Sequence, residues 1–264
     1  MGCNILLLVV LLCGLPPVYI TVFGYPEGCP EKQQRVPCNA NGTSPEKTCP
    51  GVGVFCGNGE KVCGCADSLY RNNKFRCVSA EGCVERKYET FSFLKQQEAI
   101  YLVGISKYPP HSRLPYRCMR LILRYATRHE SNRELMYEVR KGHEKEGSNK
   151  VHERKDDDSK WEEKQLWLVY WFQSKDDKVL RFFVRGERSS TEMPGSVDVV
   201  HATHQCLITG TRSKRNGKYD CTLWVKKSLV GQVPDDCDFI FKELCNNAEI
   251  ILTYKEPKCF KNYE

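Results

Sequence analysis

The stretch from Asp220 to Cys245 reads DCTLWVKKSLVGQVPDDCDFIFKELC, and it decides the fold of the second half of the chain. Its first part alternates polar and apolar residues around a tryptophan, which predicts a strand. In its second part five residues recur at the spacing of one helical face: Cys237, Ile240, Phe241, Leu244 and Cys245. This spacing predicts a helix with Asp235 or Asp236 as its N-cap. Two cysteines on the apolar face predict that the helix is held against a sheet by disulfides.

The sequence upstream of this stretch is also rich in strand signals. A helical pattern over residues 88–97 leads into segments such as AIYLVGIS and KQLWLVYWFQS, in which β-branched and aromatic residues are frequent. About eight such segments in about 180 residues favour a closed antiparallel barrel over a sandwich. The predicted fold class is therefore mainly β, with a helix before the barrel and another near its end.

Cysteine is the strongest signal in the composition. The chain has sixteen: two in the apolar N-terminus, eight from Cys29 to Cys83, and six from Cys118 to Cys259. Even numbers in both later groups indicate disulfides formed in an oxidising compartment. No CxxC pair is present, so we expect no zinc site. The density between Cys29 and Cys83 indicates a small scaffold stabilised by its bridges rather than by a large core.

The N-terminus predicts export. An apolar run from Ile5 to Leu15 is followed by small residues, as in a signal peptide covering residues 1–24. We expect a secreted, extracellular monomer with no membrane span. Residues 25–84 form the predicted cysteine-rich domain and residues 85–264 the barrel. The net charge is +7 with both signs interspersed, so we expect no nucleic-acid partner. No nucleophile triad, HExxH motif or P-loop is present, so we expect neither an enzyme nor a cofactor.

The cysteine-rich region resembles a known inhibitor scaffold. Its tail, VCGCADSLYRNNKFRCVSAEGC at residues 62–83, resembles the trypsin-inhibitor-like (TIL) domain of ascaris-type serine protease inhibitors. That family usually has ten cysteines where this chain has eight. If the missing two form one bridge, the resemblance implies four disulfides: Cys29–Cys63, Cys38–Cys56, Cys49–Cys83 and Cys65–Cys77.

The resemblance also implies a protease-binding loop. The loop is CPGVGVFC, from Cys49 to Cys56, and the family spacing places the scissile bond at Val54–Phe55. A valine at this position suits an elastase-like serine protease of the host. The alternative is a structural module without inhibitory activity. Asn41 begins an Asn-Gly-Thr sequon and is a predicted glycosylation site.

The second half resembles the tick lipocalins of the histamine-binding type. The features that carry the resemblance are Cys-x-Leu-Trp, a helix bounded by cysteines, the early YRC strand and the C-terminal YKEPKC. The resemblance implies three disulfides. It pairs Cys118 with Cys259 and Cys206 with a cysteine of the late helix, Cys237, which leaves Cys221 for Cys245.

The family also implies a ligand and a set of ligand-binding residues. Its amine-binding members read Glu-Leu-Trp where this chain has Thr222, Leu223 and Trp224, and Cys-Asp where this chain has Cys206 and Leu207. A buried protonated amine needs a carboxylate and gains from an aromatic face. The candidate ligand-binding residues are Trp224, Thr222, Asp220, Trp171, Tyr170 and Asp198. The expected function is sequestration of a small host inflammatory mediator in evasion of host defence. The ligand would be histamine or another biogenic amine by family, or an eicosanoid or fatty acid because both acids are absent.

Overall fold

The computed structural model describes residues 28–106, 116–141, 161–173, 178–185, 193–214, 216–252 and 257–260. The signal peptide expected at residues 1–24 lies outside these ranges. No helix within them is long and apolar enough to cross a membrane.

Four disulfides and short strands build the cysteine-rich region. The elements are β1 (Gln33–Pro37), β2 (Lys61–Cys65), β3 (Tyr70–Arg71), β4 (Cys77–Val78) and α1 (Ala80–Cys83). β1 pairs with β2, and β3 pairs with β4, both antiparallel. The bridges are Cys29–Cys63, Cys38–Cys56, Cys49–Cys83 and Cys65–Cys77, the pairing that the resemblance implies.

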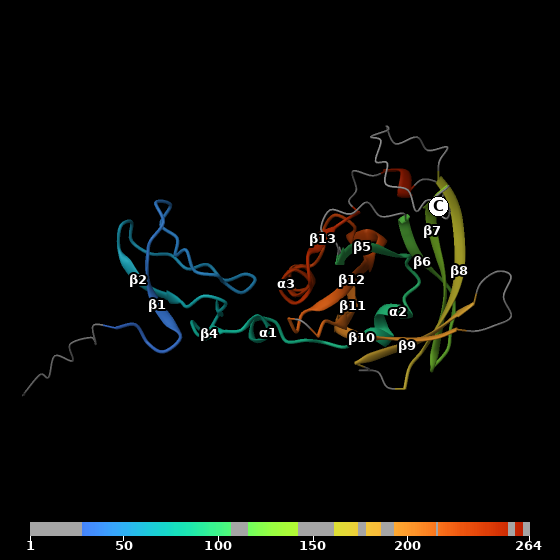
Figure 1. Ribbon diagram of the computed structural model, residues 1–264, viewed down its shortest axis with the longest axis horizontal. Coiled ribbons are helices and arrows are strands. Elements are labelled where there is room, and N and C mark those ends of the chain that lie inside the picture. Colours follow the sequence, from blue (N-terminus) through green and yellow to red (C-terminus); the bar gives the residue numbers. More distant parts are fainter. Residues whose placement is uncertain are drawn as a thin grey trace, which may run out of the picture.

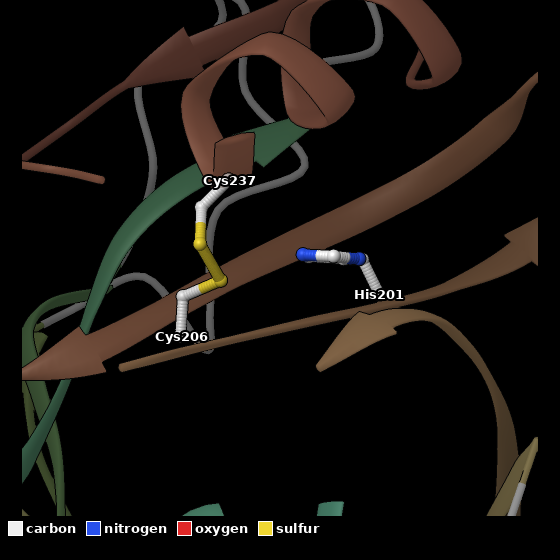
Figure 2. Close-up of side chains that lie close together, drawn as sticks. All are labelled: His201, Cys206 and Cys237. Carbon is white, nitrogen blue, oxygen red and sulfur yellow. A yellow bond between two sulfur atoms is a disulfide. The ribbon is translucent and has the colours of Figure 1, made fainter. Parts of the chain in front are cut away.

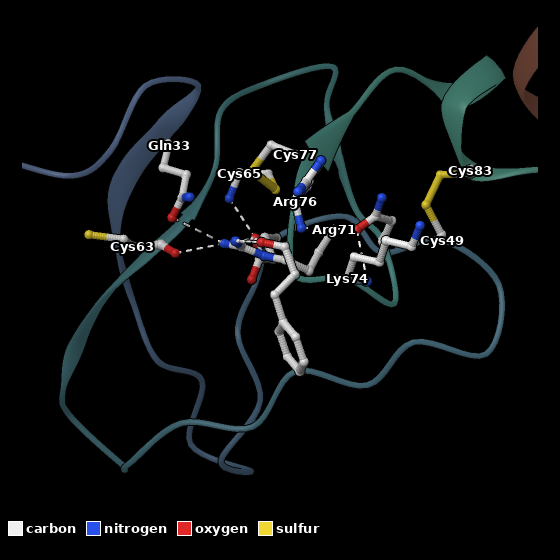
Figure 3. The surroundings of a disulfide bond; sticks show 12 residues. Gln33, Cys49, Cys63, Cys65, Arg71, Lys74, Arg76, Cys77 and Cys83 are labelled. Atoms are coloured by element: carbon white, nitrogen blue, oxygen red, sulfur yellow. Dashed lines mark hydrogen bonds and ion pairs between the residues drawn. A yellow bond between two sulfur atoms is a disulfide. The ribbon is translucent and has the colours of Figure 1, made fainter.

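A buried arginine occupies the place where a larger domain would have an apolar core. Arg71 forms an ion pair of 2.9 Å with Glu46 and donates to the backbone carbonyls of Cys63 and Phe75. Figure 3 shows its guanidinium pointing inward among the disulfides. Because a buried ion pair is stable only when its remaining donors are satisfied, these carbonyls are part of the core.

The rest of the chain is a closed antiparallel barrel. Its strands are β5 (Ile100–Ser106), β6 (Tyr116–Ala126), β7 (Glu130–Arg140), β8 (Trp161–Trp171), β9 (Val179–Arg185), β10 (Met193–Ala202), β11 (Cys206–Arg212) and β12 (Tyr219–Lys226). Each strand pairs with the next, and β12 pairs back to β5, which closes a ring of eight. A further strand, β13 (Ala248–Ile250), joins β5 at one end. The predicted fold class is confirmed.

Strand alternation separates two apolar layers. Outward-facing residues such as Ile208, Leu223 and Val225 pack under α3 (Asp235–Leu244). Inward-facing residues such as Leu207, Tyr170 and Leu121 form the barrel interior. Three disulfides reinforce the outer layer: Cys118–Cys259, Cys206–Cys237 and Cys221–Cys245. These are also the pairings that the resemblance implies, and two of them fix α3 to the barrel wall.

A short helix closes one end of the ring. In α2 (Thr90–Leu94), Phe93 and Leu94 are fully buried in the interior layer. From β7, the fully buried Arg133 donates to the backbone carbonyls of Leu94, Gln96 and Leu121. It therefore ties the end of this helix to the barrel strands.

The cysteine-rich region and the barrel meet at α3. The ring of Tyr70 packs edge-on against Phe239 at 5.4 Å, and its hydroxyl donates to Glu243. Burial, together with this carboxylate, raises the pKa of Tyr70. Figure 1 shows α3 on the outside of the ring, on the side facing the cysteine-rich region. The same helix thus contacts both parts of the chain.

Candidate functional site

A short chain of hydrogen bonds runs across the inner face of β11 and β12. The indole Nε1 of Trp224 donates to the hydroxyl of Thr222 at 3.0 Å, and that hydroxyl lies 2.8 Å from the hydroxyl of Thr209. Leu207 is paired with Trp224 in register, and its side chain belongs to the interior layer. Thr222 therefore places a neutral hydroxyl where the resemblance implies an acid, and the indole occupies one of its two acceptor lone pairs.

The interior around this chain is apolar and only partly closed. Several inward-facing side chains in mid-strand are partly buried rather than fully buried: Leu135, Phe182, Val184, Val197 and Trp224. Tyr170 is buried nearer the end closed by α2, and its ring lies 6.1 Å from that of Phe182. Inward-facing side chains in mid-strand keep part of their surface accessible to solvent only where neighbouring side chains do not fill the interior. We call this inner surface of the barrel the chamber, and its side chains are aromatic and aliphatic with a few hydroxyl groups.

Two carboxylates lie toward the other end of the barrel. Asp220 shares the face of Thr222 and Trp224, as alternation predicts, but it is exposed and accepts a hydrogen bond from Asn246 at 2.9 Å. Glu249 of β13 is in register with Ile105, which is itself in register with Thr222. Its backbone position therefore puts it on the same side of the sheet as Thr222.

Two of the predicted ligand-binding residues face away from the chamber. Asp198 lies between Val197 and Val199, which both pack in the interior, so its side chain is on the outer face. Trp171 follows the inward-facing Tyr170 and is 52% exposed. Both predictions were wrong for the same reason: a strand has two faces, and the sequence did not identify which one is buried.

The charge buried at the closed end of the barrel is positive. Arg133 has carbonyl partners, and burial lowers its pKa to about 10. It therefore stays protonated at physiological pH. The described inward positions of β11 and β12 that face the chamber carry uncharged side chains: Leu207, Thr209, Thr222 and Trp224. At these four positions no side chain offsets the positive charge of Arg133.

A histidine beneath α3 belongs to the outer wall. His201 is fully buried, accepts a hydrogen bond from the backbone N–H of Lys87 at 3.2 Å, and has its Nε2 3.5 Å from Asp236. Figure 2 shows its ring beside the Cys206–Cys237 disulfide. Because the two sulfurs are bonded to each other, they are not available as thiolate ligands for a metal. Burial lowers the pKa of His201, although Asp236 opposes the shift.

The predicted protease-binding loop of the cysteine-rich region is held at both ends. Cys49 is bridged to Cys83, and Cys56 to Cys38. Between them, the side chain of Phe55 is 82% exposed and that of Val54 is partly buried. The carbonyl of Val54 accepts a hydrogen bond from the backbone N–H of Ser44 at 3.0 Å.

Sequence reasoning missed two residues of the barrel interior. Thr209 completes the hydroxyl chain with Thr222, and Arg133 sets the sign of the buried charge. Arg133 alternates with Ser131 and Leu135 along β7, so an inward-facing arginine could have been found once Leu135 was assigned to the core. Its three carbonyl partners come from distant segments and leave no local signal.

The chain is similar to known tick proteins. A search of the curated proteins finds no match. Among solved structures, the chain resembles Japanin from Rhipicephalus appendiculatus bound to cholesterol, with 13% sequence identity and a TM-score of 0.43, covering 60% of this chain and 94% of that one. The family model of the tick histamine binding protein matches residues 125–261, more than half of the sequence. The chain therefore belongs to the tick histamine-binding protein family.

Proposed function

We propose that the barrel sequesters a small, mainly apolar molecule with a neutral or anionic head group, of the fatty-acid or eicosanoid class. The observation that carries this proposal is the hydrogen-bonded chain of Trp224, Thr222 and Thr209. It puts neutral hydroxyls at the position where the amine-binding relatives have a carboxylate. The expected consequence is removal of a host inflammatory mediator by a secreted tick protein.

The argument against a buried amine is electrostatic. Removing an ammonium ion from water costs several kcal/mol unless a carboxylate compensates for it within the protein. Thr222 and Leu207 supply no such charge, and Arg133 adds a positive one in the deep part of the chamber. Asp220 and Glu249 carry carboxylates, but they lie toward the end of the barrel opposite Arg133.

The argument for an apolar ligand rests on the lining of the chamber. Phe182, Val184 and Val197 provide partly exposed apolar surface, and Trp224 adds a large ring. Burying such surface against a ligand contributes about 25 cal/mol for each Å² removed from water. Binding sites for small molecules are commonly apolar with a few polar groups that fix orientation, and the two threonines fit that role.

The test is a pair of calorimetric titrations of the oxidised full chain, one with arachidonic acid and one with histamine. We expect the acid to bind and histamine to give no heat. Thr222→Glu should weaken the binding of arachidonic acid and introduce binding of histamine. Thr222→Val should not bind histamine. Histamine binding by the native protein that is lost in Trp224→Ala would overturn the proposal in favour of an amine ligand.

We also propose a second function, inhibition of a host serine protease by the loop from Cys49 to Cys56. The observation that favours it is an exposed phenylalanine, Phe55, on a loop whose two ends are fixed by disulfides. A loop that is already ordered loses little entropy when it binds. Full activity of chymotrypsin and of elastase in the presence of excess protein would refute this second function.

A further inference from the structure

The loop from Cys49 to Cys56 has a defined backbone orientation. Phe55 forms an antiparallel bridge with Thr43, and two hydrogen bonds flank it. The N–H of Ser44 donates to the carbonyl of Val54 at 3.0 Å, and the N–H of Cys56 donates to the carbonyl of Gly42 at 2.9 Å. The segment 42–44 therefore engages the residues before and after Phe55.

This pattern points the backbone of Phe55 outward. A trans peptide directs its carbonyl and its N–H to opposite sides. Because the carbonyl of Val54 points toward Ser44, the N–H of Phe55 points away from it. Because the N–H of Cys56 points toward Gly42, the carbonyl of Phe55 also points away. Phe55 thus presents a donor and an acceptor to a strand added at this edge, while Val54 does not.

Serine protease chemistry requires such an outward carbonyl. The enzyme polarises the scissile carbonyl in an oxyanion hole made of hydrogen-bond donors. The carbonyl of Val54 is already bonded within the scaffold, so the bond Val54–Phe55 expected from family spacing is oriented away from a docking enzyme. The carbonyl of Phe55 has the required orientation.

The side chains agree with the backbone. Phe55 is 82% exposed, and its ring lies over Gly53, where an added Cβ would come within 3.3 Å of it. The side chain of Val54 is partly buried against the scaffold. An exposed phenylalanine fits a deep apolar primary pocket, as in chymotrypsin, and is too large for the small pocket of an elastase.

We infer that Phe55, rather than Val54, is the specificity-determining residue of the loop, and that the partner is a serine protease with a deep apolar primary pocket. The inference rests on the inhibitory function proposed above. The bond presented is Phe55–Cys56. With Phe55 in place of Val54 as the specificity-determining residue, the expected protease is chymotrypsin-like rather than elastase-like.

The position of Cys56 explains why cleavage would be reversible. The catalytic serine oxygen attacks the carbonyl carbon of Phe55, the C–N bond to Cys56 breaks, and the amine takes the proton that the serine gave to the histidine. The amine of Cys56 stays in place because the Cys38–Cys56 disulfide and the carbonyl of Gly42 hold it. It can attack the ester, which restores the peptide bond and frees the enzyme.

The experiment measures inhibition constants of the oxidised full chain against chymotrypsin and pancreatic elastase. We expect inhibition of chymotrypsin. Phe55→Ala should weaken it by at least about thirtyfold, the effect of removing an interface hot spot. Val54→Ala should change it by less than about threefold, as for a residue outside the hot spot. Phe75→Ala is the matched control, because Phe75 is also exposed (67%) and lies in the same region.

The outcomes separate this inference from the inhibitory function itself. Inhibition of elastase that depends on Val54 and not on Phe55 would overturn the inference and leave the function intact. Inhibition of neither enzyme by any variant would overturn both. After long incubation with chymotrypsin, mass spectrometry should locate hydrolysis at Phe55–Cys56, with the two fragments still joined until reduction. Hydrolysis at Val54–Phe55 would contradict the inference.

Discussion

Replacing Arg133 by methionine tests the polar link between the barrel and α2. The side chain keeps its length and loses its charge and its hydrogen bonds to Leu94, Gln96 and Leu121. Hydrogen bonds from a charged donor contribute about 1.5–3 kcal/mol each, so three contribute at least about 4.5 kcal/mol. Burial lowers the pKa from 12.5 to about 10, which corresponds to a desolvation cost of about 3.4 kcal/mol.

The hydrogen bonds therefore outweigh the desolvation by at least about 1 kcal/mol. For a domain of this size, that loss should lower the melting temperature by at least about 2–4 °C. The assay is differential scanning calorimetry of the oxidised chain, with Arg133→Lys as a variant that keeps the charge and should be intermediate. Hydrogen exchange should also become faster at the amides of Phe93 and Lys95, which donate to Glu89 and Phe91. A methionine variant as stable as the parent would refute the reasoning, because the cost of the buried charge would then dominate.

Three further predictions concern the outer wall. Removing Cys118–Cys259 by a double Cys→Ser substitution should lower the denaturant midpoint more than removing Cys221–Cys245. The first bridge closes a loop of 141 residues and the second a loop of 24. The loss of loop entropy in the unfolded chain corresponds to about 5 and about 3.5 kcal/mol of stability. Gly104→Ala should destabilise the chain by about 1–3 kcal/mol, since an added Cβ would lie 2.7 Å from the ring of Phe241, whereas Gly28→Ala meets no neighbour and should be neutral in the same denaturation assay. Because the pKa of His201 is lowered in the folded state, its contribution to the free energy of unfolding should be constant above pH 6.5 and should fall as the pH drops from 6.5 through the folded-state pKa. In urea titrations across that range, the free energy of unfolding of His201→Gln should decrease less steeply than that of the parent.

The secondary structure and fold class could be predicted well from the sequence, because they depend on local and periodic signals. The helix at Asp235–Leu244 follows from apolar spacing, although its N-cap is Pro234 rather than an aspartate. Alternation placed Thr222 and Trp224 on one face of β12, and the structure puts them there. The seven disulfides have the pairings that the two resemblances imply.

The site was harder to predict because it depends on contacts between distant segments. The hydrogen bond from Ser44 to Val54 changes which residue of the loop faces outward, and no pattern within the loop indicates it. The side of the sheet on which Asp198 lies depends on which face of β10 is covered. A β-bulge between Val199 and His201 changes the alternation further along that strand. The carbonyls that accept from Arg133 belong to the end of α2, to Gln96 just after it and to β6, and these segments are brought together only in the folded barrel.

The central claim is that the barrel of this family member holds an apolar molecule with a neutral or anionic head group. The most direct measurement is calorimetric titration of the oxidised full chain with arachidonic acid, followed by histamine on the same preparation. We predict stoichiometric binding of the acid, weakened in Trp224→Ala, and no heat from histamine. Binding of histamine with no response to the acid would contradict the account and would mean that Asp220 or Glu249 supplies the missing carboxylate.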